Sequence, residues 1–389
     1  MLPIAVLQII TFPYLARVLG ATAYGEAVFL ISVFTIISFP FGNVLNNLRL
    51  LKNEDYKEKK MTGDFNRLLV YSILISIFIF LIYTTQNSLI NYKEIILLLI
   101  IIILALIKEY YIVSFRLTLN FKKIMVNNFL LAIGYLIGTY VFKVTGYWEY
   151  VYVIGLIISN VYIFRNTKLT KEGFKKTSLF NATLSSGLYL YFAGLLKNIV
   201  THADKLLLFP LLGAQNVAVY YTAAIIGRMV SMFVSPANTV ILSYLVKVNK
   251  KIKVFYYLLV ALLLGVVFYL TILFIGPIFL KLLYSGWHEE SVKILKYTAA
   301  ATMFSVIAGL FHPFNLRFND VKWQLYINGS YLMIYVGLTV ILTSYYGLIG
   351  FSIGVLLANI YNFFIQIIIY YYNSNSETKK KRRLENETC

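Results

Sequence analysis

The stretch Leu19-Gly20-Ala21-Thr22-Ala23-Tyr24-Gly25-Glu26-Ala27-Val28 joins two apolar segments, and its pattern returns in the second half of the chain. There Leu212-Gly213-Ala214 precedes Val217-Ala218-Val219-Tyr220-Tyr221, at an offset of 193, which is close to half of the 389 residues. Pro40 and Pro236 also take the same place in their segments, at an offset of 196. Internal repeats are typical of transporters that rock one half against the other. We therefore predict a two-fold duplicated membrane protein; the alternative is chance similarity between apolar segments.

The composition also indicates a membrane protein. Apolar residues make up 60% of the chain and charged residues 13%, and the mean hydropathy is +0.75, whereas a soluble domain holds about a quarter charged residues. A hydrocarbon core about 30 Å thick needs roughly 20 residues of helix. The apolar blocks that we interpret as spans are 1–15, 27–45, 68–90, 95–115, 124–142, 148–164, 179–200, 217–246, 254–280, 294–314, 323–346 and 348–372. The predicted fold is all-α, with about twelve transmembrane helices.

The distribution of positive charge predicts how these spans are oriented. Of the 35 Lys and Arg residues, 26 lie in the even-numbered connections and the C-terminal tail, 8 lie in the odd-numbered connections, and Arg228 lies within a span. Cytoplasmic loops carry the excess of Lys and Arg, so the even connections and both termini are predicted to be cytoplasmic. Because each half has an even number of spans, the repeat is parallel, with its pseudo-axis along the membrane normal. The net charge of +19 thus reflects topology rather than nucleic-acid binding.

The same pattern gives a domain organisation. We predict an N-terminal six-helix bundle over 1–165, a cytoplasmic linker over 166–178, a C-terminal six-helix bundle over 179–373 and a basic cytoplasmic tail over 374–389. The single cysteine, Cys389, allows no intramolecular disulfide.

Several enzyme classes lack their sequence signatures here. The three histidines are scattered without a His-Glu-x-x-His pattern, and the chain has neither a Gly-x-x-x-x-Gly-Lys loop nor a Gly-x-Ser-x-Gly motif. The predicted outer connections are short, and Glu289-Glu290 is the acidic pair among them, which we interpret as a solvated turn. We therefore expect a transporter with no cofactor and no bound metal, rather than an enzyme.

Ionisable residues within spans are the candidate functional residues, because a charge deep in a bilayer costs at least a few kcal/mol. Arg228 lies more than ten residues into the eighth span; the alternative is a structural partner for a buried group. Lys197 and Asp204 are seven residues apart and so share a helical face, although either could extend to the outer interface instead. Arg17 is replaced by Pro210 in the second repeat. Arginine binds phosphate oxygens in two places at once, so such a cavity favours an anionic substrate.

Two further arginines, Arg49 and Arg116, lie at predicted cytoplasmic ends of spans. Positive side chains are common there, so we interpret both as determinants of topology rather than as site residues.

The chain resembles a known transporter family over nearly its whole length. The residues that carry the resemblance are Phe12-Pro13-Tyr14-Leu15-Ala16-Arg17-Val18-Leu19-Gly20-Ala21 with Tyr24-Gly25, then Arg116 with Asn120-Phe121-Lys122-Lys123, and Asp204-Lys205-Leu206-Leu207-Leu208 with Leu212-Gly213 and Tyr220-Tyr221. They look like the motifs of the Wzx-type O-antigen repeat-unit flippases of the multidrug/oligosaccharidyl-lipid/polysaccharide superfamily. The polar lead-in and first turns of span one that this family shows are missing here.

The resemblance implies two six-helix bundles around a central cavity, as in the multidrug (MATE-like) members. It implies a flippase for undecaprenyl-diphosphate-linked oligosaccharide, an O-antigen or capsule repeat unit of lipopolysaccharide or polysaccharide biosynthesis, in the bacterial inner membrane. By resemblance Arg17, Asp204, Arg228 and, less closely, Lys197 would bind the substrate. Membrane lipids, a polysaccharide polymerase and a chain-length regulator are the implied partners. The alternatives are a multidrug antiporter of the same superfamily and a membrane-embedded polymerase.

Overall fold

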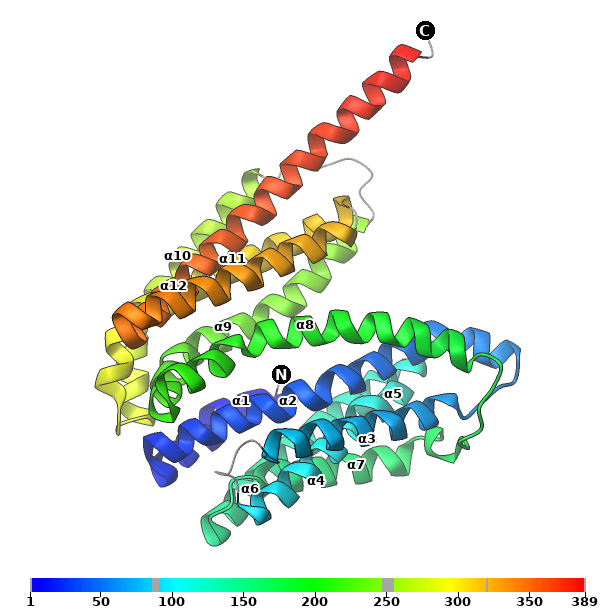
Figure 1. Ribbon diagram of the computed structural model, residues 1–389, viewed down its shortest axis with the longest axis horizontal. Coiled ribbons are helices and arrows are strands. Elements are labelled where there is room, and N and C mark those ends of the chain that lie inside the picture. The colour runs from blue at the N-terminus through cyan, green and yellow to red at the C-terminus, as the bar shows by residue number, and fades with distance from the viewer. Residues whose placement is uncertain (1, 86–90, 247–254, 320, 388–389) are drawn as a thin grey trace. The chain divides into compact units, whose positions relative to one another are not determined.

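The computed structural model of the chain describes residues 2–85, 91–246, 255–319 and 321–387. In these ranges the chain forms helices and turns without a strand, which confirms the all-α prediction. The elements in chain order are α1 (Leu2–Val6), the π-helix η1 (Leu7–Thr11), α2 (Phe12–Glu58), α3 (Asp64–Thr85), α4 (Tyr92–Tyr111), α5 (Val113–Leu117), α6 (Phe121–Thr145), α7 (Tyr150–Asn166), the 3-10 helix η2 (Leu169–Lys171), α8 (Phe180–Leu212), α9 (Ala214–Val246), α10 (Phe255–Leu283), α11 (His288–Phe318) and α12 (Val321–Glu387) (Figure 1).

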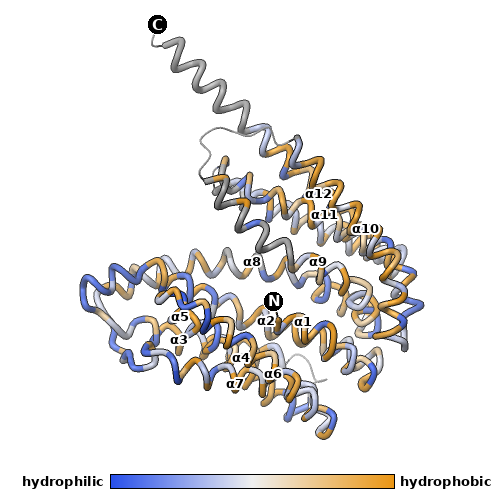
Figure 2. Tube along the Cα trace, turned by 180° about the vertical axis from the view of Figure 1, so that it is seen from behind, coloured by the Kyte–Doolittle hydropathy of each residue, from blue (hydrophilic) through white to orange (hydrophobic). Residues whose placement is uncertain are grey.

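The described residues include seven helices that are long and apolar enough to cross a membrane. Two of them, Leu2–Glu58 and Tyr326–Tyr372, each cover a pair of the predicted spans. The protein is therefore a multi-pass membrane protein, while the count of twelve spans stays a prediction. Figure 2 shows that hydrophobic residues occupy long stretches of these helices.

The glycines of the repeated Leu-Gly-Ala motif mark equivalent breaks in the chain. Gly20 interrupts α2 with φ 74° and ψ 174°, and Gly213, with φ 82°, separates α8 from α9. Glycine adopts positive φ at little cost because it has no Cβ. A third break, at Gly347 with φ 56°, falls between the two predicted spans that α12 contains. The predicted span boundaries near residues 19 and 347 thus correspond to backbone breaks.

The chain divides into two compact units, which are described separately here. The first consists of Met1–Val18 and Ala27–Leu206, and the second of Leu19–Glu26 and Leu207–Cys389. The short segment after Val18 therefore packs within the second unit, and most of α8 packs within the first. The domain boundaries at 165 and 179 remain a prediction.

The first unit is built around α4 and α7. One face of α4 is buried where it packs against α3 and α7, through Leu98, Ile101, Ile102 and Leu106. Helix α6 packs along α7 through Gly134 and Gly138, which form a Gly-x-x-x-Gly motif. A Cβ added to Gly134 would lie 2.5 Å from the Cα of Gly155, and one added to Gly138 would lie 2.5 Å from the Cα of Val151. Small residues at such spacing let two membrane helices approach closely.

Substituting Gly138 with alanine is expected to destabilise the first unit. The new methyl group meets backbone atoms of α7, which cannot move as a side chain does, so we expect a loss of about 1–3 kcal/mol and a lower Tm. Gly337→Ala is the matched control, because nothing lies within 4 Å of a Cβ at that helical position. The control should leave Tm unchanged or raise it, since alanine favours helix by about 1 kcal/mol. Equal Tm values for both variants would contradict the proposed α6–α7 packing.

The second unit is built around α11. This helix packs along α9, α10 and α12, and its buried residues Ile307, Ala308, Phe311 and Phe314 contribute to two apolar clusters with residues of α9, α10 and α12. Helix α10 instead exposes large apolar side chains, among them Phe274 and Ile278. Exposed apolar surface of this extent is expected where a helix faces lipid rather than water.

Candidate functional site

Arg228 lies on α9 in the second unit and is half-buried. Its guanidinium carbon is 4.8 Å from the centroid of the Tyr221 ring. The two residues are seven apart, so the side chains follow one face of the helix over two turns. A cation above an aromatic ring is stabilised by about 0.5–2 kcal/mol, depending on its exposure to water. The contact orients the planar fork of Arg228 within an apolar helix.

The ring beneath Arg228 belongs to a buried aromatic cluster. The centroid of Tyr24 lies 6.3 Å from that of Tyr221, 6.2 Å from that of Tyr284 and 5.8 Å from that of Trp287. Tyr24 comes from the segment Leu19–Glu26, which packs in this unit. Tyr24, from the repeated motif of the first half, therefore packs beside Tyr221.

Hydrogen bonds fix the α9 end of this cluster to α11. The Nε1 of Trp287 donates to the Oγ1 of Thr222 over 3.1 Å, and Thr222 and Ser291 are joined hydroxyl to hydroxyl over 2.8 Å. All three residues are buried. The aromatic surface beneath Arg228 is therefore held in place by hydrogen bonds. Groups that are already ordered lose less conformational entropy when they bind a ligand.

The other three candidate residues belong to the first unit. Arg17 is exposed near the Gly20 break of α2. Asp204 is buried on α8, and its Oδ1 pairs with the Nζ of the adjacent Lys205 over 3.2 Å. Lys197 is also on α8, but its side chain lies outside the described residues. Within the first unit, Asp204 is thus joined to Lys205, which is not among the site residues predicted from the sequence.

A second polar region lies in the first unit, at the ends of α2, α3 and α4 that are predicted to face the cytoplasm. Asp64, at the start of α3, is fully buried. Its Oδ2 accepts hydrogen bonds from the Tyr56 hydroxyl at 2.8 Å and the Thr177 hydroxyl at 2.5 Å, and its Oδ1 accepts one from the Thr177 backbone N–H at 2.8 Å. Thr177 belongs to the predicted linker, so this carboxylate attaches the linker to α3.

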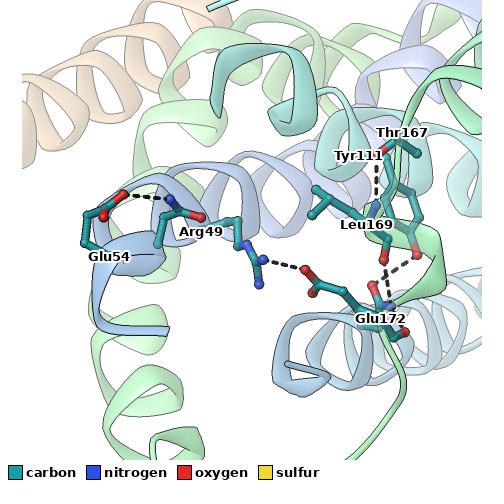
Figure 3. A network of polar contacts seen from close by, with 8 residues as sticks. Arg49, Glu54, Tyr111, Thr167, Leu169 and Glu172 are labelled. Atoms are coloured by element: carbon teal, nitrogen blue, oxygen red, sulfur yellow. Dashed lines mark hydrogen bonds and ion pairs between the residues drawn. The ribbon is translucent and has the colours of Figure 1, made fainter. Parts of the chain in front are cut away.

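The same linker is attached a second time through Arg49 (Figure 3). The Nη2 of Arg49 is 2.6 Å from the Oε1 of Glu172, and both side chains are largely buried. The guanidinium carbon of Arg49 also lies 4.7 Å from the centroid of the Phe65 ring. Burial raises the pKa of the Glu172 carboxyl, and the charge and hydrogen bond of Arg49 oppose that increase. Arg49 therefore stabilises the fold through a buried ion pair, in addition to its predicted contribution to membrane topology.

Asn66 adds a third attachment. Its Nδ2 donates to the backbone carbonyls of Leu169 and Glu172 at 3.2 and 2.6 Å, and its Oδ1 accepts from the Tyr111 hydroxyl at 3.1 Å. We name the residues Arg49, Asp64, Asn66, Glu172 and Thr177 the linker clamp. It holds the connection between α7 and α8 against α2 and α3.

Neither the linker clamp nor the buried carboxyl of Glu149 is predicted from the sequence. The residues that pair within the clamp are far apart in sequence: Arg49 and Glu172 are separated by 123 residues. A local signal existed for Asp64 alone, as an acid just before a long apolar helix, where a helix N-terminus favours negative charge. In the described residues no group of three or more His, Cys, Asp or Glu could hold a metal ion.

Comparisons with known proteins identify the fold. A family model described as Polysaccharide biosynthesis protein matches residues 2–249. Among solved structures, the lipid II flippase MurJ in an inward closed conformation is similar with a TM-score of 0.71 and 16% identity, covering 93% of this chain and 84% of that chain. A mutant of the Vibrio cholerae MATE transporter VcmN gives 0.62 and 14%, covering 96% and 95%. No curated protein sequence matches the chain. At identities this low, the structural likeness shows the fold alone.

Proposed function

The chain belongs to the polysaccharide biosynthesis protein family, and from this premise we propose that it is a lipid-linked oligosaccharide flippase. Its cargo is an undecaprenyl-diphosphate-linked oligosaccharide, an O-antigen or capsule repeat unit, which it moves from the cytoplasmic to the outer leaflet of the inner membrane. The similarity in fold to a lipid II flippase supports this choice. The observation that carries it is Arg228, a half-buried arginine oriented by Tyr221 in an apolar helix.

The chemistry of the cargo matches these residues. A diphosphate needs donors that bind two oxygens together, and the fork of Arg228 offers them. In the first unit, Arg17, Lys197 and Asp204 are the further substrate-binding residues that we propose, because the resemblance implies them. The polyprenyl chain stays in the lipid while the headgroup crosses. Release on the outer side requires weaker phosphate contacts in the outward state, because a ligand that binds both states equally shifts neither.

Both termini lie in the cytoplasm, and the units delivered outside pass to a polysaccharide polymerase and its chain-length regulator. No cofactor is needed, because the chain itself forms or breaks no bond of the cargo.

A multidrug antiporter is the second candidate, supported by the likeness to MATE transporters. Organic cations need acidic residues that remain available to bind them. Two buried acids of the first unit, Asp64 and Asp204, are instead bonded to Thr177 and Lys205. These bonds occupy two of the buried acids, whereas Glu149 has no partner in another described residue. We favour the anionic cargo because of Arg228.

The test is a flipping assay with the purified full-length protein in liposomes. A fluorescent undecaprenyl-diphosphate oligosaccharide is placed in both leaflets, and a membrane-impermeant reducing agent bleaches the outer pool. We expect complete bleaching with the protein and about half without it, and slower flipping of the matching monophosphate lipid. No acceleration over protein-free liposomes, together with uptake of an organic cation, would replace the flippase with the antiporter.

A further inference from the structure

Glu149 is a buried acid that the proposed transport mechanism does not use. It immediately precedes α7, and its backbone carbonyl accepts the first hydrogen bonds of that helix, from the N–H groups of Tyr152 and Val153. The residue is fully buried. In the described part of the chain, neither of its carboxyl oxygens has a hydrogen-bond partner in another residue. The other buried acids of the first unit differ, because Asp64, Glu172 and Asp204 are each bonded to a neighbour.

Among the described residues, no cation is paired with Glu149, although charged groups lie at the nearby ends of α2, α4 and α6. On α4, Glu94 adds negative charge nearby, and the Nζ of Lys93 lies over the Tyr147 ring, 5.1 Å from its centroid. Lys143 at the end of α6 and Arg17 on α2 are exposed. The residues that flank Glu149, Trp148 and Val151, are buried apolar side chains.

A carboxylate in such surroundings loses its hydration without gaining an ion pair among the described residues. Desolvation disfavours the charged form of an acid, so the neutral form with its proton is the stable one. The negative charge of the nearby Glu94 disfavours the charged form as well.

We propose that Glu149 is a proton-binding site of the first unit, occupied while this end of α7 is closed and emptied when it opens to water. On opening, the O–H bond of the carboxyl breaks, the proton passes to water, and the carboxylate remains hydrated. The site follows from the packing of α4, α6 and α7 and does not depend on the cargo. The N-terminal end of α7 is predicted to lie at the outer side of the membrane. A lower pH on that side should therefore favour the closed arrangement.

The sign of the pH effect on stability follows from the bound proton. The buried carboxyl keeps its proton to a higher pH in the folded protein than in the unfolded chain, which releases it above its ordinary value of about 4.3. The stabilisation from Glu149 is therefore complete at low pH and is lost as the pH rises.

Two measurements on the purified full-length protein test the proposal. The first compares Tm from pH 5 to pH 9 for wild type and Glu149→Gln, with Glu290→Gln as a matched control at an exposed glutamate. Glutamine imitates the protonated acid, so we expect the Tm of Glu149→Gln to rise relative to wild type as the pH increases, and Glu290→Gln to follow wild type. Parallel curves for wild type and Glu149→Gln would overturn the proposal.

The second measurement uses the wild-type protein, so it does not depend on whether a variant folds. Infrared spectroscopy of the wild type detects the C=O stretch of a protonated carboxyl, which shifts in heavy water. We expect such a band at pH 7, which disappears as the pH is raised further. Its absence at pH 7 would overturn the proposal. Neither measurement involves lipid-linked cargo, so a negative result here leaves the flipping assay unaffected, and a negative flipping assay leaves this site unaffected.

Discussion

Cells whose only copy of this protein carries Arg228→Ala are expected to lose surface polysaccharide and to accumulate the lipid-linked repeat unit in the cytoplasmic leaflet. The substitution removes the guanidinium that would bind the diphosphate. Truncating one partner of a desolvated charge pair costs about 2–5 kcal/mol, and the lower figure already means roughly thirty-fold weaker binding. The measurement is quantification of extracted repeat unit and of surface polysaccharide, at matched protein levels in the membrane.

Two further variants make this result specific. Arg228→Lys keeps the charge but loses the bidentate fork, so it should give an intermediate rate. Arg67→Ala is the matched control, since Arg67 also lies over a tyrosine ring, Tyr71, with 5.8 Å between its guanidinium carbon and the ring centroid. It should transport normally. Normal surface polysaccharide in Arg228→Ala would remove this residue from the binding site.

Arg49→Ala is expected to have the largest effect on stability. It deprives the largely buried Glu172 carboxylate of its cation and removes the contact with Phe65. Breaking a buried ion pair by removing one partner costs about 3–5 kcal/mol, because the remaining charge is left uncompensated. The free energy of unfolding, measured by denaturant titration of the purified protein in detergent, should fall by this amount.

The pH and a second substitution separate this cause from simple loss of packing. Because burial raises the pKa of Glu172, its protonation at mildly acidic pH removes the uncompensated charge, and the deficit of Arg49→Ala should shrink as the pH falls. The double variant Arg49→Met/Glu172→Met should recover much of the loss. Lys57→Ala breaks an exposed pair with Glu54 and should leave the midpoint unchanged. A double variant as unstable as Arg49→Ala would show that the ion pair is not the cause.

Much of the fold could be predicted from the sequence because helices and their breaks depend on residues that are close together in the chain. Apolar blocks of sufficient length became helices, and the motif glycine Gly20 breaks α2 as the boundary between predicted spans required. The helix ends are less well predicted: α3 begins at Asp64 and α11 at His288, before the apolar blocks that suggested them. Polar residues continue a helix where its ends leave the membrane, so hydropathy alone underestimates helix length.

The polar sites could be predicted only in part. Arg228 was found because a charge inside an apolar block is visible locally. Arg49 was interpreted as a determinant of topology, since nothing near it in sequence shows that it is buried against Glu172. Glu149 stands at the edge of an apolar block, and its burial depends on how α4, α6 and α7 pack together. Burial and pairing are properties of contacts between distant segments, and one sequence does not contain them.

The close glycine packing of α6 on α7 also bears on how the chain is assembled during synthesis. A comparable contact occurs in α12, where a Cβ on Gly354 would lie 2.8 Å from the Cα of Thr339. In both cases the partners are near neighbours in sequence, so little loop-closure entropy opposes their meeting. Each half of the repeat should therefore end in a helical hairpin that forms as soon as its second helix has entered the bilayer. These two hairpins should be among the first tertiary structures that the newly made protein forms.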